Sequence, residues 1–115
     1  MTIVDRDPGA FNRFASRGVF SNEFRGNFVV GDGTEAELLR RAGVEDTNRF
    51  VAVTEGDNRN IMAAQIAQQV FKVPKVVCRI YDPIRYEVYR KLGLDVFCPT
   101  LEGAATVRGM IAEGA

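Results

Sequence analysis

The stretch NFVVGDGTEAELLRRAG, residues 27–43, holds the pattern that decides the fold class. Residues 27–30 are mostly β-branched or aromatic and predict a short strand. A Gly-Asp-Gly turn follows, and Thr34 and Glu37 then have the spacing of a capping box at the start of a helix that Gly43 ends. A strand, a glycine turn and a helix in this order form the unit from which parallel α/β sheets are built.

The same alternation continues on both sides of this stretch and predicts a parallel sheet with helices on both faces. Acid-proline pairs at residues 7–8 and 82–83 mark two helix starts, because aspartate caps a helix and proline suits its first position. Residues 17–26 are expected to form a loop, and Asp57 or Asn58 can cap the third helix. We expect strands at residues 2–4, 27–30, 50–53, 75–80 and 96–98, and helices at residues 8–16, 34–42, 57–71, 83–92 and 104–112.

The composition is that of an ordinary folded domain and excludes several chemistries. With 115 residues, of which 46% are hydrophobic and 26% charged, the chain has room for one core. It has no histidine, which removes Ser-His-Asp and Cys-His catalysis and the usual imidazole metal ligand. Lys plus Arg and Asp plus Glu are both 15, so we expect no nucleic acid partner, because the positive field that such binding needs is absent.

Cysteine spacing indicates a reducing compartment, and hydropathy gives no candidate membrane span. Cys78 and Cys98 lack the paired spacing of a zinc or redox motif and are interpreted as small buried apolar residues. The longest charge-free stretch, residues 60–71, is only about a dozen residues long and includes four side-chain amides, so it is too short and polar to span a bilayer. The charges at residues 5–7 argue against a signal peptide.

Side chains that follow the strands are the candidates for ligand binding, because open parallel sheets bind ligands outside the carboxyl ends of their strands. These positions hold Asp5, Asp32, Thr54 and Arg79. The Asp5 carboxylate offers two acceptor oxygens to the hydroxyls of a ribose. The alternative is that Asp5 and Asp7 form a turn and cap before the first helix.

Residues 31–36 match the G-x-G-x-x-A pattern of a pyrophosphate loop. A complete strand and helix precede the match, however, and Asp32 would place a negative charge among donors meant for phosphate. A turn that touches an adenine edge is therefore the better interpretation.

The two later strand ends carry alternatives of their own. Thr54 and Asn60 either hydrogen-bond a nucleotide or cap the third helix and orient its loop. Arg79 lies in an apolar strand, where a cation without a partner is costly. Its partner is either a phosphate or the carboxylate of Asp57 or Asp82.

Seven motifs, in order along nearly the whole chain, resemble the TrkA N-terminal (KTN/RCK) domain family of potassium-transport regulators. The resemblance implies a Rossmann-like cytoplasmic domain that binds NAD(H) or ATP/ADP, forms homo-oligomers and regulates a membrane potassium channel or transporter without catalysis. The motifs are Ile3-Val4-Asp5-Arg6-Asp7, Val29-Val30-Gly31-Asp32-Gly33-Thr34, Arg41-Ala42-Gly43-Val44, Val51-Ala52-Val53-Thr54, Asp57-x-x-Asn60, Arg79-x-x-Asp82-Pro83 and Leu92-Gly93-x-x-x-x-Cys98-Pro99-Thr100.

The resemblance also implies roles for single residues. Asp5 would hold the adenosine ribose, Asp32 and Thr34 would line the adenine side, and Arg79 would face the phosphates. Gly56 departs from the acidic residue that the family usually has before Asp57. The remaining implied binding residues are Arg6, Gly33, Thr54, Asp57 and Asn60.

In the family, a first strand and a glycine-rich loop would precede Thr2, so residues 1–115 are expected to be a truncated domain with weakened nucleotide binding. That strand would be central, and we therefore expect the strands at residues 2–4 and 50–53 to pair directly or to borrow a strand from another copy. Two rival interpretations stay open, a fragment of an NAD-dependent oxidoreductase and a structural oligomerisation domain that has lost nucleotide binding.

Overall fold

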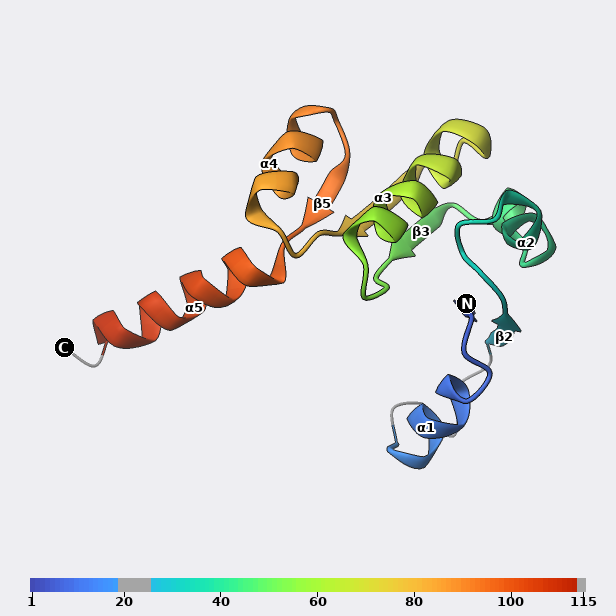
Figure 1. The fold of residues 1–115 in the computed structure, drawn as a ribbon, viewed down its shortest axis with the longest axis horizontal. Coiled ribbons are helices and arrows are strands. Elements are labelled where there is room, and N and C mark those ends of the chain that lie inside the picture. The colour runs from blue at the N-terminus through green and yellow to red at the C-terminus, as the bar shows by residue number, and fades with distance from the viewer. Residues whose placement is uncertain (19–25, 114–115) are drawn as a thin grey trace. The chain divides into compact units, whose positions relative to one another are not determined.

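The computed structural model describes residues 1–18 and 26–113, which fall into two compact units, residues 1–46 and 47–115 (Figure 1). Most of the loop expected at residues 17–26 lies outside the described residues. Each unit is a parallel sheet with helices beside it.

The N-terminal unit is built on two parallel strands, in which Asp5 lies opposite Val30. The ring centroids of Phe11 and Phe28 are 4.6 Å apart, which joins the first helix to the second strand. Ala10, Leu38, Leu39 and Val44 are buried. The elements are β1 (Thr2–Asp5), α1 (Ala10–Ser16), β2 (Asn27–Val30), α2 (Ala36–Arg41) and the 3-10 turn η1 (Val44–Asp46).

The C-terminal unit has a three-stranded parallel sheet in the order β3-β4-β5. Helix α3 (Asp57–Gln65) is buried along one face. It continues into a π-helical turn, in which the Phe71 amide donates to the Ile66 carbonyl. Cys78, Ile80 and Asn60 are the most completely buried large side chains of the unit. The elements are β3 (Arg49–Ala52), α3 (Asp57–Gln65), η2 (Ile66–Val70), β4 (Lys75–Arg79), α4 (Pro83–Lys91), β5 (Asp95–Phe97) and α5 (Pro99–Glu113).

The predicted order of strands and helices is confirmed, and so is one of its caps. The Asp82 carboxylate accepts the Ile84 amide at 3.0 Å, with Pro83 in the first helical turn of α4. The capping box predicted from Thr34 and Glu37 is wrong. Helix α2 begins at Ala36 without a side-chain cap, because Thr34 turns back to the Asp32 carboxylate instead.

Two other local predictions need correction. Helix α3 has Gly56 at its N-cap and no side-chain cap, because the Asp57 carboxylate binds amides from another loop. Helix α5 begins at Pro99, five residues before the expected residue 104, and the Cys98 carbonyl accepts the Glu102 amide in its first turn. Proline at the first position of a helix explains this early start.

Within the N-terminal unit β1 pairs with β2, and within the C-terminal unit β3 pairs with β4. The expectation that the strands at residues 2–4 and 50–53 pair directly or borrow a strand from another copy concerns both units and stays a prediction.

Gly31 and Gly33 give a test of why the turn after β2 contains glycine. A Cβ atom on Gly31 would lie 2.5 Å from Leu38 Cδ2 and 2.8 Å from Leu38 Cγ, whereas a Cβ atom on Gly33 would meet nothing within 4 Å. Since Leu38 is buried, Gly31→Ala should lower the free energy of unfolding by about 1–3 kcal/mol. Gly33→Ala should change it by less than about 1 kcal/mol. Urea denaturation measures both, and equal effects would contradict this account of Gly31.

Candidate functional site

The carboxyl ends of β1 and β2 bring the N-terminal candidates to one edge of the two-stranded sheet. Asp5 is the last residue of β1, and its carbonyl accepts the Gly31 amide at 3.0 Å, directly after β2. Asp5 and Asp32 therefore lie at the carboxyl ends of neighbouring parallel strands. Arg6 is exposed, and Gly33 is half-buried in the turn.

Each of the acids at this edge organises its own turn. The Asp5 carboxylate accepts the Asp7 amide at 2.8 Å through Oδ1. Asp32 Oδ1 accepts both the amide and the hydroxyl of Thr34, at 2.9 and 2.7 Å. The turn predicted as the alternative role of Asp5 is thus formed, and in the described part of the chain it uses one of the two carboxylate oxygens of Asp5.

Asp7 belongs to the start of α1. Its carboxylate accepts the Gly9 amide at 2.9 Å and pairs with Arg13 at 2.8 Å. The hydrogen bond from Arg13, with that from the Gly9 amide, lowers the pKa of Asp7 below its usual range. Asp7 is exposed, so this ion pair contributes little to stability.

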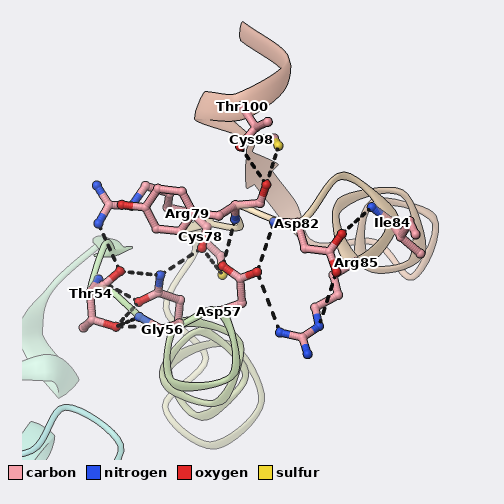
Figure 2. A network of polar contacts seen from close by, with 12 residues as sticks. Thr54, Gly56, Asp57, Cys78, Arg79, Asp82, Ile84, Arg85, Cys98 and Thr100 are labelled. Carbon is pink, nitrogen blue, oxygen red and sulfur yellow. Dashed lines mark hydrogen bonds and ion pairs between the residues drawn. The ribbon is translucent and has the colours of Figure 1, made fainter. Parts of the chain in front are cut away.

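In the C-terminal unit, the side chain of Asn60 joins the ends of two strands at Thr54 and Arg79. Figure 2 labels these two strand-end residues. The Oδ1 atom of Asn60 accepts the amide and the hydroxyl of Thr54, at 2.7 and 2.6 Å. Its Nδ2 group donates to the carbonyls of Thr54 and Arg79, at 3.0 and 2.9 Å. Asn60 is 0% exposed, so this amide has its full set of partners inside the protein.

Arg79 ends β4 and extends toward the end of β3. Its Nη2 atom donates to the Val53 carbonyl and to the Thr54 carbonyl, and its guanidinium lies 4.8 Å from the ring centroid of Tyr81. Its Nε atom is buried without a hydrogen-bond partner among the described residues. Among the described residues, the partners of Arg79 are thus carbonyls and an aromatic face. The sequence predicts a phosphate, or the carboxylate of Asp57 or Asp82, as its partner.

Those two carboxylates instead hold the loop that follows β4. Asp57 accepts the amides of Tyr81 and Asp82 at 2.8 and 3.1 Å, and its side chain is 8% exposed. Both Asp57 and Asp82 lie 3.8 Å from nitrogens of Arg85. The first turn of α3 therefore contacts the ends of both β3 and β4.

Tyr81 was not singled out by sequence analysis, yet it is a junction of this network. Its carbonyl accepts the Thr100 hydroxyl at 2.9 Å and the Cys98 thiol at 3.5 Å. Both donors flank the start of α5. The only sequence signal was proximity to the Asp82-Pro83 helix start, which predicts a loop but names no partner for its carbonyl.

Four of the nine predicted site residues, Thr54, Asp57, Asn60 and Arg79, are thus brought together in the C-terminal unit, and the other five lie at the strand edge of the N-terminal unit. Among the described residues there is no cluster of acids and cysteines able to hold a metal ion. No described helix combines the length and apolar character that a bilayer crossing requires.

Parallel sheets with surrounding helices and polar side chains at the strand ends define the Rossmann-like class of α/β domains. The chain belongs to the TrkA-N domain family, whose model matches residues 1–99 and so crosses both units.

Comparisons with single proteins agree with this family. The Trk system potassium uptake protein TrkA of Streptomyces coelicolor is 44% identical over 108 residues, which cover 94% of this chain and 43% of that protein. A TrkA homolog of Methanothermobacter thermautotrophicus is 27% identical over 86 residues, covering 74% of this chain and 39% of that protein. This chain spans about two fifths of the length of these relatives.

A solved structure, Shewanella denitrificans Kef CTD in AMP-bound form, has the same fold. It matches with a TM-score of 0.74 and 19% sequence identity, covering 99% of this chain and 67% of that one.

The reactivity of the Cys78 thiol reports on whether Cys78 is buried in the C-terminal unit. Burial, with a smaller contribution from the Asp57 carboxylate, raises the pKa of Cys78 from 9.0 to about 11. Folding therefore favours the protonated thiol, and this stabilisation is complete below pH 9 and lost as the pH rises through about 11.

Alkylation of Cys78 by iodoacetamide at pH 8 should be at least about tenfold slower in the native protein than in denaturant, because thiolate is scarce and the sulfur is covered. Peptide mapping of the two alkylated cysteines measures the rates. Equal rates in native and denatured protein would contradict the burial of Cys78.

Proposed function

We propose that this chain is a cytoplasmic, nucleotide-sensing regulatory domain of a potassium uptake system, acting by binding rather than by catalysis. Membership of the TrkA-N family supports this proposal. The relatives in Streptomyces and Methanothermobacter are named as potassium uptake proteins, and the partner proposed here is accordingly a membrane potassium channel or transporter subunit.

The observation that carries the nucleotide proposal is the acid at the end of β1. Asp5 uses one carboxylate oxygen for the Asp7 amide, and a ribose hydroxyl can donate to the other. Asp32, with Thr34 and Gly33 in its turn, follows the neighbouring strand and is proposed for the adenine side. Arg6 is the exposed cation closest to Asp5 in sequence.

The proposed ligand class is an adenine nucleotide, either NAD(H) or ATP/ADP. Adenosine is common to all of these and to the AMP bound in the Kef structure. Arg79 is proposed to serve the phosphates, because its Nε–H group has no partner among the described residues and can donate a hydrogen bond to a phosphate oxygen. Thr54 lies next to Arg79, because the Thr54 carbonyl accepts a hydrogen bond from Arg79 Nη2.

We also propose that the chain forms homo-oligomers through α5. All residues of this helix from Thr100 to Glu113 are exposed, including Val107 at 54%, Met110 at 67% and Ile111 at 68%. A 15-residue helix with glycines at two interior positions is only marginally stable alone in water. A second copy would cover its apolar side.

Asp5→Ala should weaken binding of NADH and ADP by about ten- to a hundredfold, because hydrogen bonds to a charged group contribute about 1.5–3 kcal/mol. Asp7→Ala, the matched loss of an acid in the same loop, should change affinity by less than about twofold. Isothermal calorimetry measures both.

The unsubstituted chain should prefer NAD(H) to NADP(H), since Asp5 would repel a 2′-phosphate. Failure of the unsubstituted chain to bind any adenine nucleotide would overturn the proposed function.

Light scattering tests the proposed interface. The chain should form at least a dimer at high micromolar concentration, and Ile111→Glu should shift it toward monomer by burying a charge in the interface. Ala105→Glu is the control on the side of α5 opposite Val107, Met110 and Ile111, and it should leave assembly unchanged. A monomeric unsubstituted chain, with and without nucleotide, would contradict the proposal.

A further inference from the structure

Two polar side chains one turn apart at the start of α3 are directed at protein backbone instead of solvent. Asn60 is 0% exposed, and the Asp57 side chain is 8% exposed. Residues three apart lie on the same side of a helix, so both side chains face the ends of β3 and β4. The sequence predicts a nucleotide contact for both, with a structural alternative for each: Asn60 caps α3 and orients its loop, and Asp57 caps α3 or pairs with Arg79.

The bonding capacity of Asn60 leaves none for a ligand. A side-chain amide has two acceptor sites and two donor hydrogens. Thr54 fills both acceptor sites with its amide and hydroxyl, and the carbonyls of Thr54 and Arg79 take the two hydrogens. The contact with Thr54 is thus reciprocal, and the contact with Arg79 fixes the end of β4 relative to the end of β3.

Asp57 extends the same restraint beyond β4. Its two oxygens each accept one amide, Oδ1 that of Tyr81 and Oδ2 that of Asp82. Arg79 in turn donates to the Thr54 carbonyl and stacks against Tyr81. The side chain proposed to meet phosphate is therefore held between two segments that α3 fixes.

We propose that Asn60 and Asp57 are positioning residues. They fix the positions of Thr54 and Arg79 relative to each other and act on the nucleotide only through these two residues. The proposal rests on the proposed function, because it assigns these residues a role in binding the same ligand. Their effect on affinity comes from the unliganded protein, in which the strand ends are already held in place for the ligand.

The decisive variant is Asn60→Asp, with Asn58→Asp as the matched control. Asp at position 60 keeps the acceptor for Thr54 but places a carboxylate oxygen against the carbonyls of Thr54 and Arg79. Asn58 is exposed in the same helical turn, so its replacement adds the same charge without touching the network. Asn60→Asp should lower the affinity for ADP and NADH by about tenfold or more, and by the same factor for both, whereas Asn58→Asp should stay within about twofold.

Hydrogen exchange without ligand gives a readout that a general loss of stability would not reproduce. In Asp57→Asn, at least one of the amides of Tyr81 and Asp82 should exchange at least about tenfold faster, because the new side chain keeps one acceptor oxygen and its NH2 group cannot accept the second hydrogen bond. The Val76 amide in the β3-β4 ladder should be unchanged and serves as the reference for global unfolding. This variant keeps the test available if Asn60→Asp does not fold.

The outcomes separate the two proposals. Equal ADP affinity in Asn60→Asp and the unsubstituted chain, or unchanged exchange at Tyr81 and Asp82 in Asp57→Asn, would overturn the positioning role alone. If the unsubstituted chain binds neither ADP nor NADH, the proposed function fails, and the positioning role for a ligand fails with it.

Discussion

A side-chain amide without any exposed surface must find all its hydrogen-bond partners inside the protein, and Asn60 meets this constraint at the ends of two parallel strands. Its partners are the backbone and hydroxyl of Thr54 and the carbonyl of Arg79. Breaking one of these bonds would leave a buried polar group unpaired, at a cost of about 1–3 kcal/mol. The geometry of the strand ends in the C-terminal unit depends on this one side chain, and the loops that follow are arranged around it.

The order of elements was predictable from sequence because its signals are local. Asp82 and Pro83 start α4 through contacts within three residues, and Gly43 and Gly93 have the positive φ angles, 96° and 95°, that end α2 and α4. Glycine is the residue that adopts this backbone conformation without strain. Such features need no knowledge of the rest of the chain.

The candidate site was only partly predictable, because its polar groups choose among partners far apart in sequence. The sequence predicts Asp57 or Asn58 as the cap of α3, but Asp57 binds amides 24 and 25 residues further along. Arg79 was expected to meet a carboxylate or phosphate, and it meets carbonyls 25 and 26 residues earlier. Their positions after the strands identified these residues as candidate site residues, whereas the three-dimensional arrangement decided which groups they contact. Tyr81 carried no such signal, since its hydrogen bonds are made by its backbone amide and carbonyl and its ring only meets the Arg79 guanidinium.

Amide NMR spectra recorded during a titration with ADP test the central claim most directly, because they locate the ligand without any substitution. We expect the amide shifts to change at the strand ends, at Asp5, Thr34, Thr54 and Tyr81, and the amide shifts of α4 beyond its first turn to stay unchanged. Shift changes confined to the outer residues of α2 and α4, or no change at millimolar ADP, would contradict the claim that the strand ends of this TrkA-N domain bind an adenine nucleotide.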